Sequence, residues 1–245
     1  MRVPYSHDEQ VHNFVAPREV VPFIMSIVQP TSVLDVGCGT GTWLKVFEEN
    51  GITDYVGVDG SYVDQTLLKI HKKHFVAHDL QRPLRLHRQF DLVVSLEVAE
   101  HLAEQFSDQF VESLVSHGEI ILFSAAIPSQ GGQNHLNEQW PEYWQQKFGK
   151  HGFIFLDQIR PVIWENKNVE WWYKQNIFLV KKKNQSESLA PIQQMVHPDL
   201  YRQVVSNHLE YIKSLRDGRQ GIKIALEILL NAIVYKIKAI FGLNH

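Results

Sequence analysis

Cysteine is nearly absent from this chain of 245 residues, which holds a single one, Cys38. One thiol excludes an internal disulfide framework and a zinc site made of four thiolates. So low a cysteine content is typical of proteins that work in a reducing compartment. The sequence therefore favours a cytoplasmic location and a chemistry that does not depend on paired thiols.

Long apolar runs are also missing. No stretch of about 18 uncharged apolar residues occurs, so no transmembrane helix is predicted. The first ten residues, MRVPYSHDEQ, lack the apolar core that a secretion signal carries behind its basic residue. We therefore expect neither a secretion signal nor a membrane span.

The chain has no excess of positive charge. Its 24 Lys and Arg residues are outnumbered by 27 Asp and Glu residues, which gives a net charge of −3. A protein of this charge has no general attraction for nucleic acid phosphates. The charge is unevenly spread, because residues 211–245 hold six basic and two acidic residues, a net of +4, which leaves −7 for residues 1–210. This asymmetry indicates two parts of different character.

Strand and helix signals alternate along the first three quarters of the chain. Such alternation predicts a mainly parallel sheet covered by helices on both faces. The strands are expected at 32–36, 55–58, 75–77, 90–96, 119–124, 153–158 and 176–183, and the helices at 20–28, 40–50, 99–116 and 139–149.

A polar stretch, 181–188, reads as a linker, and only helices are predicted in 197–241. The sequence thus predicts an α/β domain at 1–184 and a helical C-terminal extension at 185–245.

A glycine-rich loop follows the first predicted strand. The segment LDVGCGTG places Asp35 two residues before the first of three glycines, Gly37, Gly39 and Gly41. Glycines at such a point let the backbone turn sharply and let a ligand approach the main chain. A dinucleotide-binding loop needs a glycine where this chain has Thr42, which disfavours a nicotinamide oxidoreductase. The G-x-G-x-G spacing resembles that of the class I S-adenosylmethionine (SAM) methyltransferases.

This resemblance implies SAM as the cofactor and a Rossmann-like fold with a seven-stranded, mostly parallel sheet. The loop residues Gly37, Cys38, Gly39 and Gly41 would lie along the amino acid end of SAM. Asp35 would lie near the ammonium group of the cofactor, usually with water between them.

The end of the second predicted strand carries a further acidic residue. Asp59, followed by Gly60, lies 24 residues after Asp35. A carboxylate at the end of a strand can accept hydrogen bonds from both ribose hydroxyls, as in dinucleotide-binding folds. The alternative is a surface Asp that caps a helix beginning at Ser61.

The next two strand ends extend the resemblance. It implies that Asp79 faces the amino group of adenine and that the backbone amide of Leu80 reaches a ring nitrogen. It also implies that Leu96 and Glu97 lie beside the adenosine and methionine portions of SAM. The alternatives are an ordinary turn at Asp79 and an ordinary helix start after Glu97.

Several acceptor classes lack their signatures. No N-P-P-Y or D-P-P-Y motif follows the fourth predicted strand, where adenine and glutamine amino methyltransferases carry it. Cys38 lies in the glycine loop and not beside a proline, which disfavours methylation of cytosine C5 through a thiolate. Together with the acidic charge of residues 1–210, these absences favour a small molecule or a sugar as the partner and disfavour nucleic acid.

Two histidines are candidate catalytic bases. Methylation of a hydroxyl requires removal of its proton, and an imidazole with an ordinary pKa of about 6.5 suits that task at neutral pH. His101 ends a Glu-His motif after the fourth predicted strand, and His135 lies in the long loop 125–138. The alternative for His101 is a structural histidine that is hydrogen-bonded to the loop.

The loop continues into the pattern H-x-N-E-x-W-P-x-Y-W, which resembles methyltransferases that modify sugars and secondary metabolites. In that resemblance the polar residues face the acceptor and the aromatic residues pack as a lid. The predicted acceptor pocket then consists of Asn137, Glu138, Trp140, Tyr143 and Trp144. The alternative is that Asn137 caps the next helix while the aromatic rings fill the core.

The spacing of the candidate ligands predicts no metal ion. Glu97, Glu100 and His101 are close in sequence, and His135 precedes Glu138 by three residues. This spacing matches no zinc signature. The methyltransferases that use magnesium ligate it mostly with carboxylates and amides.

The apolar segment 222–241 carries only four charged residues, Lys223, Glu227, Lys236 and Lys238. Charges at these points make it a poor membrane span. It could lie on a membrane surface, in which case the protein is peripheral to the membrane, or pair with a second copy, or pack against the catalytic domain.

The sequence as a whole predicts a SAM-dependent methyltransferase that acts on a small molecule. A hydroxyl of a sugar or secondary metabolite is the first choice of acceptor. The alternatives are N-methylation of an amino sugar, O-methylation of a quinone or lipid-like molecule, and a domain that binds SAM without catalysis.

Overall fold

The computed structural model describes residues 13–184 and 191–240. The chain divides into two compact units, residues 1–197 and 198–245. This boundary lies later than the predicted one because residues 191–197 are bonded to the first unit. The Arg160 guanidinium donates to the carbonyl of Gln193 at 3.1 Å, and the His197 N–H donates to Gln175 Oε1 at 2.8 Å.

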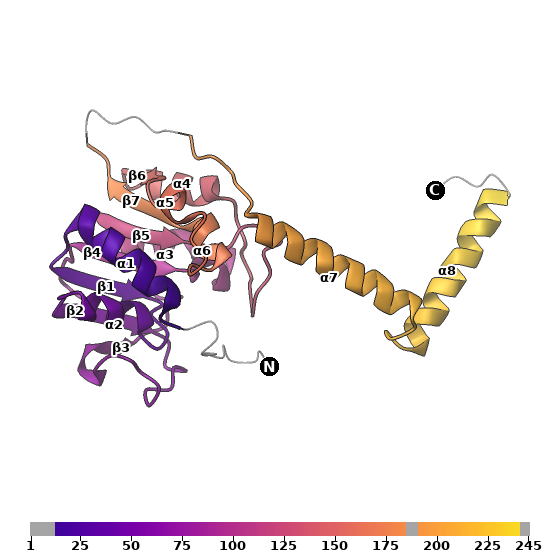
Figure 1. Cartoon of the computed structure of the whole chain (residues 1–245), viewed down its shortest axis with the longest axis horizontal. Coiled ribbons are helices and arrows are strands. Elements are labelled where there is room, and N and C mark those ends of the chain that lie inside the picture. Colours follow the sequence, from indigo (N-terminus) through magenta and orange to yellow (C-terminus); the bar gives the residue numbers. More distant parts are fainter. Residues whose placement is uncertain (1–12, 185–190, 241–245) are drawn as a thin grey trace. The chain divides into compact units, whose positions relative to one another are not determined.

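The first unit is built on a seven-stranded sheet with the order β3-β2-β1-β4-β5-β7-β6 (Figure 1). All pairings are parallel except those of β7, which runs antiparallel to both of its neighbours. The predicted Rossmann-like, mostly parallel sheet is confirmed. The strands are β1 (Ser32–Val36), β2 (Asp54–Asp59), β3 (Phe75–Ala77), β4 (Leu92–Leu96), β5 (Ile120–Ser124), β6 (Phe153–Leu156) and β7 (Phe178–Lys182).

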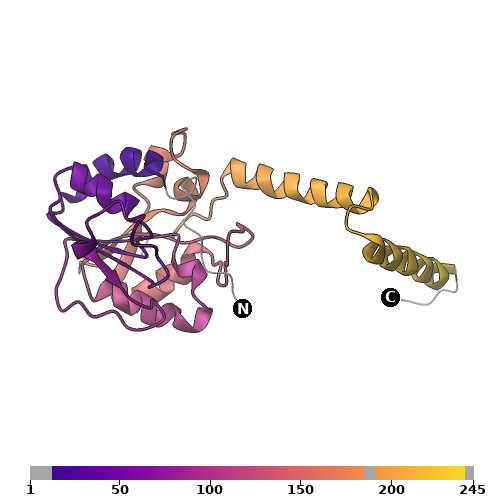
Figure 2. The same ribbon diagram turned by 90° about the horizontal axis from the view of Figure 1, so that it is seen from below.

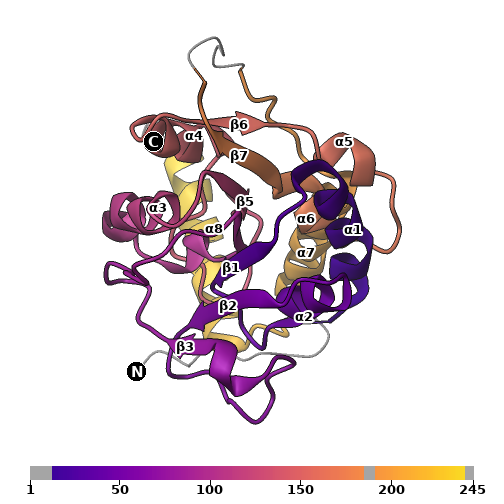
Figure 3. The ribbon, with the colours of Figure 1, turned by 90° about the vertical axis from the view of Figure 1, so that its left-hand side faces the viewer.

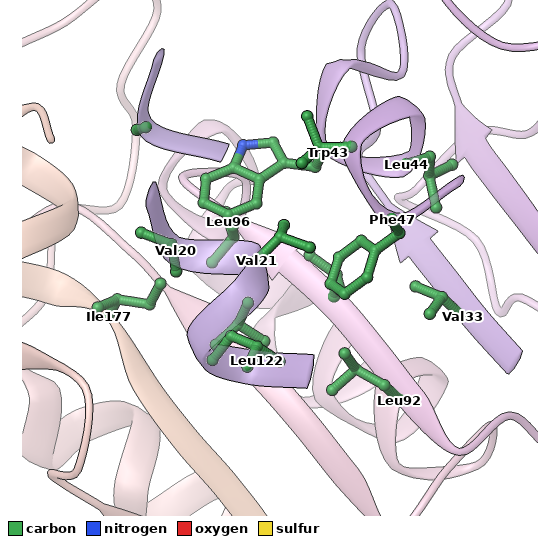
Figure 4. Close-up of a cluster of buried hydrophobic side chains, with 14 of the residues drawn as sticks. Val20, Val21, Val33, Trp43, Leu44, Phe47, Leu92, Leu96, Leu122 and Ile177 are labelled. Atoms are coloured by element: carbon green, nitrogen blue, oxygen red, sulfur yellow. The ribbon is translucent and has the colours of Figure 1, made fainter. Parts of the chain in front are cut away.

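Helices cover both faces of this sheet (Figure 3). One face carries α1 (Val15–Val28), α2 (Thr42–Glu49), α5 (Arg160–Ile163) and α6 (Trp171–Asn176), and the other carries α3 (Ser107–Val115) and α4 (Pro141–Gly149). Successive strand residues point to opposite faces, so that Val33 packs under α1 and α2 while Leu34 packs under α3. Figure 4 shows the first of these two clusters, with Val20 and Val21 of α1 and Trp43, Leu44 and Phe47 of α2 lying over Val33, Leu92 and Leu122.

The predicted helix at 99–116 is interrupted in the structure. Two short 3₁₀ turns, η2 (Ala99–His101) and η3 (Glu104–Phe106), precede α3. The carbonyl of Glu100 accepts hydrogen bonds from the N–H groups of Leu136 (2.7 Å) and Asn137 (3.0 Å). It is therefore not available to the N–H four residues later, which an α-helix requires. Contact with a distant loop ends the helical pattern here.

A third 3₁₀ turn, η1 (Lys72–His74), precedes β3.

The second unit consists of two helices, α7 (Pro198–Arg216) and α8 (Ile222–Ile240) (Figure 2). Apolar side chains of α8 such as Leu226 and Leu230 are exposed. None of the described helices combines the length and apolarity needed to cross a membrane. The predicted linker lies partly in β7, which ends at Lys182, and its residues 185–188 fall outside the described part of the chain.

Asp91 joins the starts of the central strands β1 and β4. Its Oδ2 accepts hydrogen bonds from the backbone N–H groups of Thr31 (2.8 Å) and Ser32 (3.0 Å) and from both of their hydroxyls. These bonds, chiefly those from Thr31, lower the pKa of Asp91. A lowered pKa stabilises the fold above the unfolded value of about 3.9, and this contribution is lost as the pH falls through the folded value.

Asp91→Asn is therefore expected to lower the free energy of unfolding at pH 7 by about 1 kcal/mol. The difference from the unsubstituted chain should shrink as the pH falls below about 3.9, as measured by urea unfolding at several pH values. Glu112→Gln on the exposed side of α3 is the control. A deficit of Asp91→Asn that stayed constant down to pH 2 would contradict the electrostatic origin.

Candidate active site

The glycine loop turns the chain from β1 into α2. The N–H groups of Gly37 and Cys38 both donate to the carbonyl of Val58, at 2.7 and 3.1 Å, which ties the loop to β2. Gly37 has a φ of +87°, and a Cβ built on it would lie 2.3 Å from Cγ2 of Val98. The loop therefore packs against the segment after β4 at a distance that only glycine allows.

Two buried carboxylates flank this loop. Asp59 Oδ2 accepts from the N–H of Gly39 at 2.7 Å, while its Oδ1 accepts from the N–H of Gly60 at 2.6 Å and the hydroxyl of Tyr62 at 2.7 Å. Asp35 is 3% exposed. Burial, and then the negative charge of Asp59, raise the pKa of Asp35 well above its usual value. A cation beside Asp35 would relieve both effects.

A pocket opens beside Asp35. It is lined by four predicted cofactor residues, Asp35, Gly37, Cys38 and Leu96, and by residues that the sequence analysis did not single out, including Asn13, Trp43, Glu170 and Tyr173. Burial raises the pKa of the Cys38 thiol, so Cys38 is not a thiolate nucleophile.

Two contacts close one side of this pocket. The rings of Trp43 and Tyr173 meet edge to face at 5.3 Å. The Asn13 amide donates to Glu170 Oε1 at 3.0 Å. The aromatic run Trp-Trp-Tyr at 171–173 is the feature of the sequence from which this wall could have been found.

Buried amides hold Glu97 at the end of β4. Its carboxylate accepts from Gln130 Nε2 at 2.8 Å and from Asn176 Nδ2 at 3.1 Å, and Asn176 also donates to Gln130 Oε1 at 2.8 Å. Gln175 completes this amide network through a bond of 3.1 Å to Asn176 Oδ1. The network links the strand end, the loop 125–138 and α6. Sequence reasoning missed it.

The two candidate catalytic histidines lie together, although 34 positions separate them in the sequence. The ring centroids of His101 and His135 are 4.9 Å apart and nearly perpendicular. Burial, and then the charge of His135, lower the pKa of His101 to about 4, so His101 is neutral at pH 7.

His135 is oriented by Glu138. Its Nδ1 is 2.8 Å from Glu138 Oε1, and the carboxylate of Glu138 also accepts from the N–H groups of Ser129 (2.8 Å) and Gly131 (2.7 Å). Burial raises the pKa of Glu97, and the amides and then His135 oppose that rise. The histidine pair therefore lies next to the amide network. Tyr173, in the wall of the pocket, is also near, because burial and, to a smaller extent, the charge of Glu97 raise the pKa of its hydroxyl.

A family model described as a methyltransferase domain matches residues 7–173, more than half of the chain. The chain belongs to the class I SAM-dependent methyltransferases. SAM is therefore its cofactor. The residues of the site fit this group, because the glycine loop lacks the side chains that would block it and Asp35 offers a buried negative charge to the SAM ammonium.

Solved structures share the fold of this methyltransferase. A SAM-dependent methyltransferase from Clostridium acetobutylicum is 12% identical, with a TM-score of 0.54 over 73% of this chain and 96% of that one. A SAM-bound amino pentose methyltransferase from Micromonospora echinaspora is 14% identical, with a TM-score of 0.54 over 75% and 99%. Magnesium protoporphyrin IX methyltransferase from Synechocystis, with bound SAM, is 16% identical, with a TM-score of 0.51 over 74% and 86%. No curated protein matches the chain in sequence.

Most of the predicted acceptor residues of this methyltransferase pack α4 against its neighbours. Asn137 is buried and donates to the hydroxyl of Ser107 at 3.0 Å, and the hydroxyl of Tyr143 donates to the same oxygen at 3.1 Å. Trp144 is 2% exposed and lies in the core 5.5 Å from the ring of Phe123. Trp140 is half-buried and precedes the first turn of α4. Of the predicted pattern, His135 contacts the ring of His101, and Glu138 contacts His135.

The residues predicted to contact adenine, Asp79 and Leu80, follow the end of β3. Asp79 follows β3, which pairs with β2, but its exposed carboxylate accepts from the N–H of Gln81 at 3.0 Å and does not line the pocket described above. Leu80 is half-buried against the core under α3.

Gly37→Ala is expected to destabilise the methyltransferase by about 2–4 kcal/mol. The change combines an unfavourable φ, which costs roughly 1 kcal/mol, with a clash against Val98 that costs about 1–3 kcal/mol. Gly51→Ala is a matched control, because Gly51 has a φ of +98° and nothing lies within 4 Å of its missing Cβ. Urea unfolding of both variants separates the two effects, and equal losses would show that the contact with Val98 is unimportant.

Proposed function

We propose that this methyltransferase transfers the methyl group of SAM to a hydroxyl of a small molecule, either a sugar or a secondary metabolite. The contact between His101 and His135 carries the proposal. His101 follows β4, whose last residue, Leu96, lines the pocket, and His135 packs against it from the loop 125–138. A hydroxyl has to lose its proton on methylation, whereas a neutral amine already offers a lone pair. Two imidazoles at this point therefore favour an oxygen acceptor.

The pocket beside Asp35 is the proposed SAM site. SAM supplies an electrophilic methyl group on its sulfonium, so most of the reactivity is its own. The buried carboxylate of Asp35 attracts the ammonium group. Asp59 accepts hydrogen bonds from the ribose hydroxyls in place of the one from Tyr62. Asp79 and Leu80, which follow β3, contact the adenine.

A small acceptor is supported by charge and by analogy. The net charge of −7 over residues 1–210 repels nucleic acid. Among the proteins that share the fold, one is named for an amino pentose and one for magnesium protoporphyrin IX. N-methylation of an amino sugar is therefore the second candidate, and it needs less of a base.

A screen of labelled-methyl transfer tests the proposal. Candidate sugars, metabolites and lipid extracts are incubated with the enzyme and labelled SAM, and the methylated atom is identified by mass spectrometry. His101→Ala and His135→Ala should each lower turnover by about 100-fold or more while SAM affinity persists. His208→Ala, on the exposed surface of α7, should change neither.

The other outcomes point elsewhere. A label recovered on nitrogen would replace the proposal by N-methylation. Unchanged turnover in both histidine variants would remove these residues from the reaction. SAM binding without transfer to any acceptor would favour a domain that binds SAM but does not catalyse.

A further inference from the structure

We propose that Glu100, His101 and His135 bind one divalent transition-metal ion. One carboxylate oxygen and two imidazole nitrogens, one from each residue, all lie within 4.8 Å of one another. Ligands at about 2.0–2.2 Å from a common ion are separated by at most about 4.4 Å. Small side-chain rotations would therefore close the set around an ion. The spacing of these residues in the sequence matches no metal signature, because His135 comes from a separate loop.

The surroundings of the Glu100 carboxylate independently support an ion at this point. The residue is 0% exposed, and neither carboxylate oxygen forms a hydrogen bond of standard geometry with the described residues, although the backbone amides of Glu100 and Ala126 lie near the carboxylate. A buried carboxylate without a partner is costly. The carboxylate of Glu97 lies close enough to repel it. A divalent cation between Glu100 and the histidines would balance this charge.

His135 is held in the manner of a metal ligand. A ligating histidine usually donates its second ring N–H to a carboxylate or carbonyl, which fixes the ring. Here Nδ1 of His135 is bonded to Glu138 Oε1 at 2.8 Å, and Glu138 is itself fixed by two backbone N–H groups. This leaves Nε2 for the ion. A Cβ at Gly132 would lie 2.2 Å from that Nε2, so only glycine fits against the ring at this point, and any larger residue would displace it.

The ligand chemistry selects the class of ion. Two imidazoles and one carboxylate suit Zn²⁺, Co²⁺, Mn²⁺ or Fe²⁺, whereas Mg²⁺ and Ca²⁺ prefer sites made of oxygen alone. Three protein ligands leave coordination positions open. An ion here would bind the acceptor oxygen and make its hydroxyl more acidic. This role of the ion rests on the proposed function. In it, the two histidines act through the ion that they bind.

Metal binding by the full chain, freed of metal with a chelator and without an affinity tag, tests the site. Co²⁺ is titrated with detection by visible absorption, and Zn²⁺ is titrated in a calorimeter. We expect one ion per chain. Glu100→Gln, His101→Ala and His135→Ala should each weaken binding by at least about 100-fold, and Glu138→Gln by about 10- to 100-fold. His208→Ala should bind as the unsubstituted chain does, and SAM affinity should persist in every variant.

A measurement on the unsubstituted chain covers the case in which a variant fails to fold. Zn²⁺ should protect His101 and His135, but not His208, from diethyl pyrocarbonate, as mapped by mass spectrometry. The site is refuted if the chain binds no ion, if the ligand variants bind as tightly as His208→Ala, or if Zn²⁺ protects neither histidine. Because no acceptor is present, these results are independent of whether the methylated atom is oxygen.

Discussion

Asp59→Ala should weaken SAM binding by about 100-fold, which corresponds to about 2.7 kcal/mol. The carboxylate has two tasks in the proposed site. It accepts hydrogen bonds from the N–H groups of Gly39 and Gly60, and these bonds hold the glycine loop against the end of β2. It is also the proposed acceptor for the ribose hydroxyls. Hydrogen bonds to a charged group are worth about 1.5–3 kcal/mol each, so the loss of even one accounts for most of this effect.

Calorimetric titration with SAM and with its demethylated product measures the loss. Asp64→Asn is the matched control, because Asp64 is an exposed acidic residue that only supports the nearby turn at Thr66. Tyr62→Phe should not weaken binding, since the Tyr62 hydroxyl occupies the oxygen that ribose would take. Unchanged affinity in Asp59→Ala would show that the ribose lies elsewhere.

Much of the fold could be predicted because its signals are local. The run SVLDV was predicted as a strand and forms β1, Ser32–Val36. The sharp turn after it depends on glycines whose φ values are positive, and that requirement is visible in the sequence itself. The helix predicted at 99–116 was partly wrong because its interruption depends on Leu136 and Asn137, whose N–H groups come from more than 30 residues away.

The candidate site was predictable only in part for the same physical reason. Residues at strand ends, such as Asp35 and Leu96, could be placed from the parallel sheet alone. Gln130 and Asn176 gave no signal, because an amide is buried only when its partners are buried with it. The aromatic residue Trp144 was assigned to the acceptor pocket, but its size and its place on α4 put it in the core.

Arg160 joins α6 to Asp157, and Arg160→Met should lower the free energy of unfolding by about 2–3 kcal/mol. The side chain is 0% exposed. Its guanidinium forms a two-point bond with Asp157, at 2.8 and 2.6 Å, and lies 4.2 Å from the centre of the Phe178 ring. It also donates to the carbonyl of Gln175 at 3.1 Å. Methionine fills similar volume but leaves the Asp157 carboxylate and the Gln175 carbonyl without their donor.

Arg88 provides an unusually close control for this prediction. It forms the same two-point bond with Asp54 and lies at the same 4.2 Å over a phenylalanine ring, that of Phe90, but its side chain is 42% exposed. Arg88→Met should therefore cost less than about 1 kcal/mol, because water replaces the lost partner. Urea unfolding of both variants compares a similar ion pair and ring contact, made in one case by a buried arginine that also bonds backbone carbonyls and in the other by an exposed one. Equal losses would mean that burial of the Arg160 pair adds nothing. Because Gln175 belongs to the amide network that holds Glu97, Arg160→Met should also disturb the site while Arg88→Met leaves it intact.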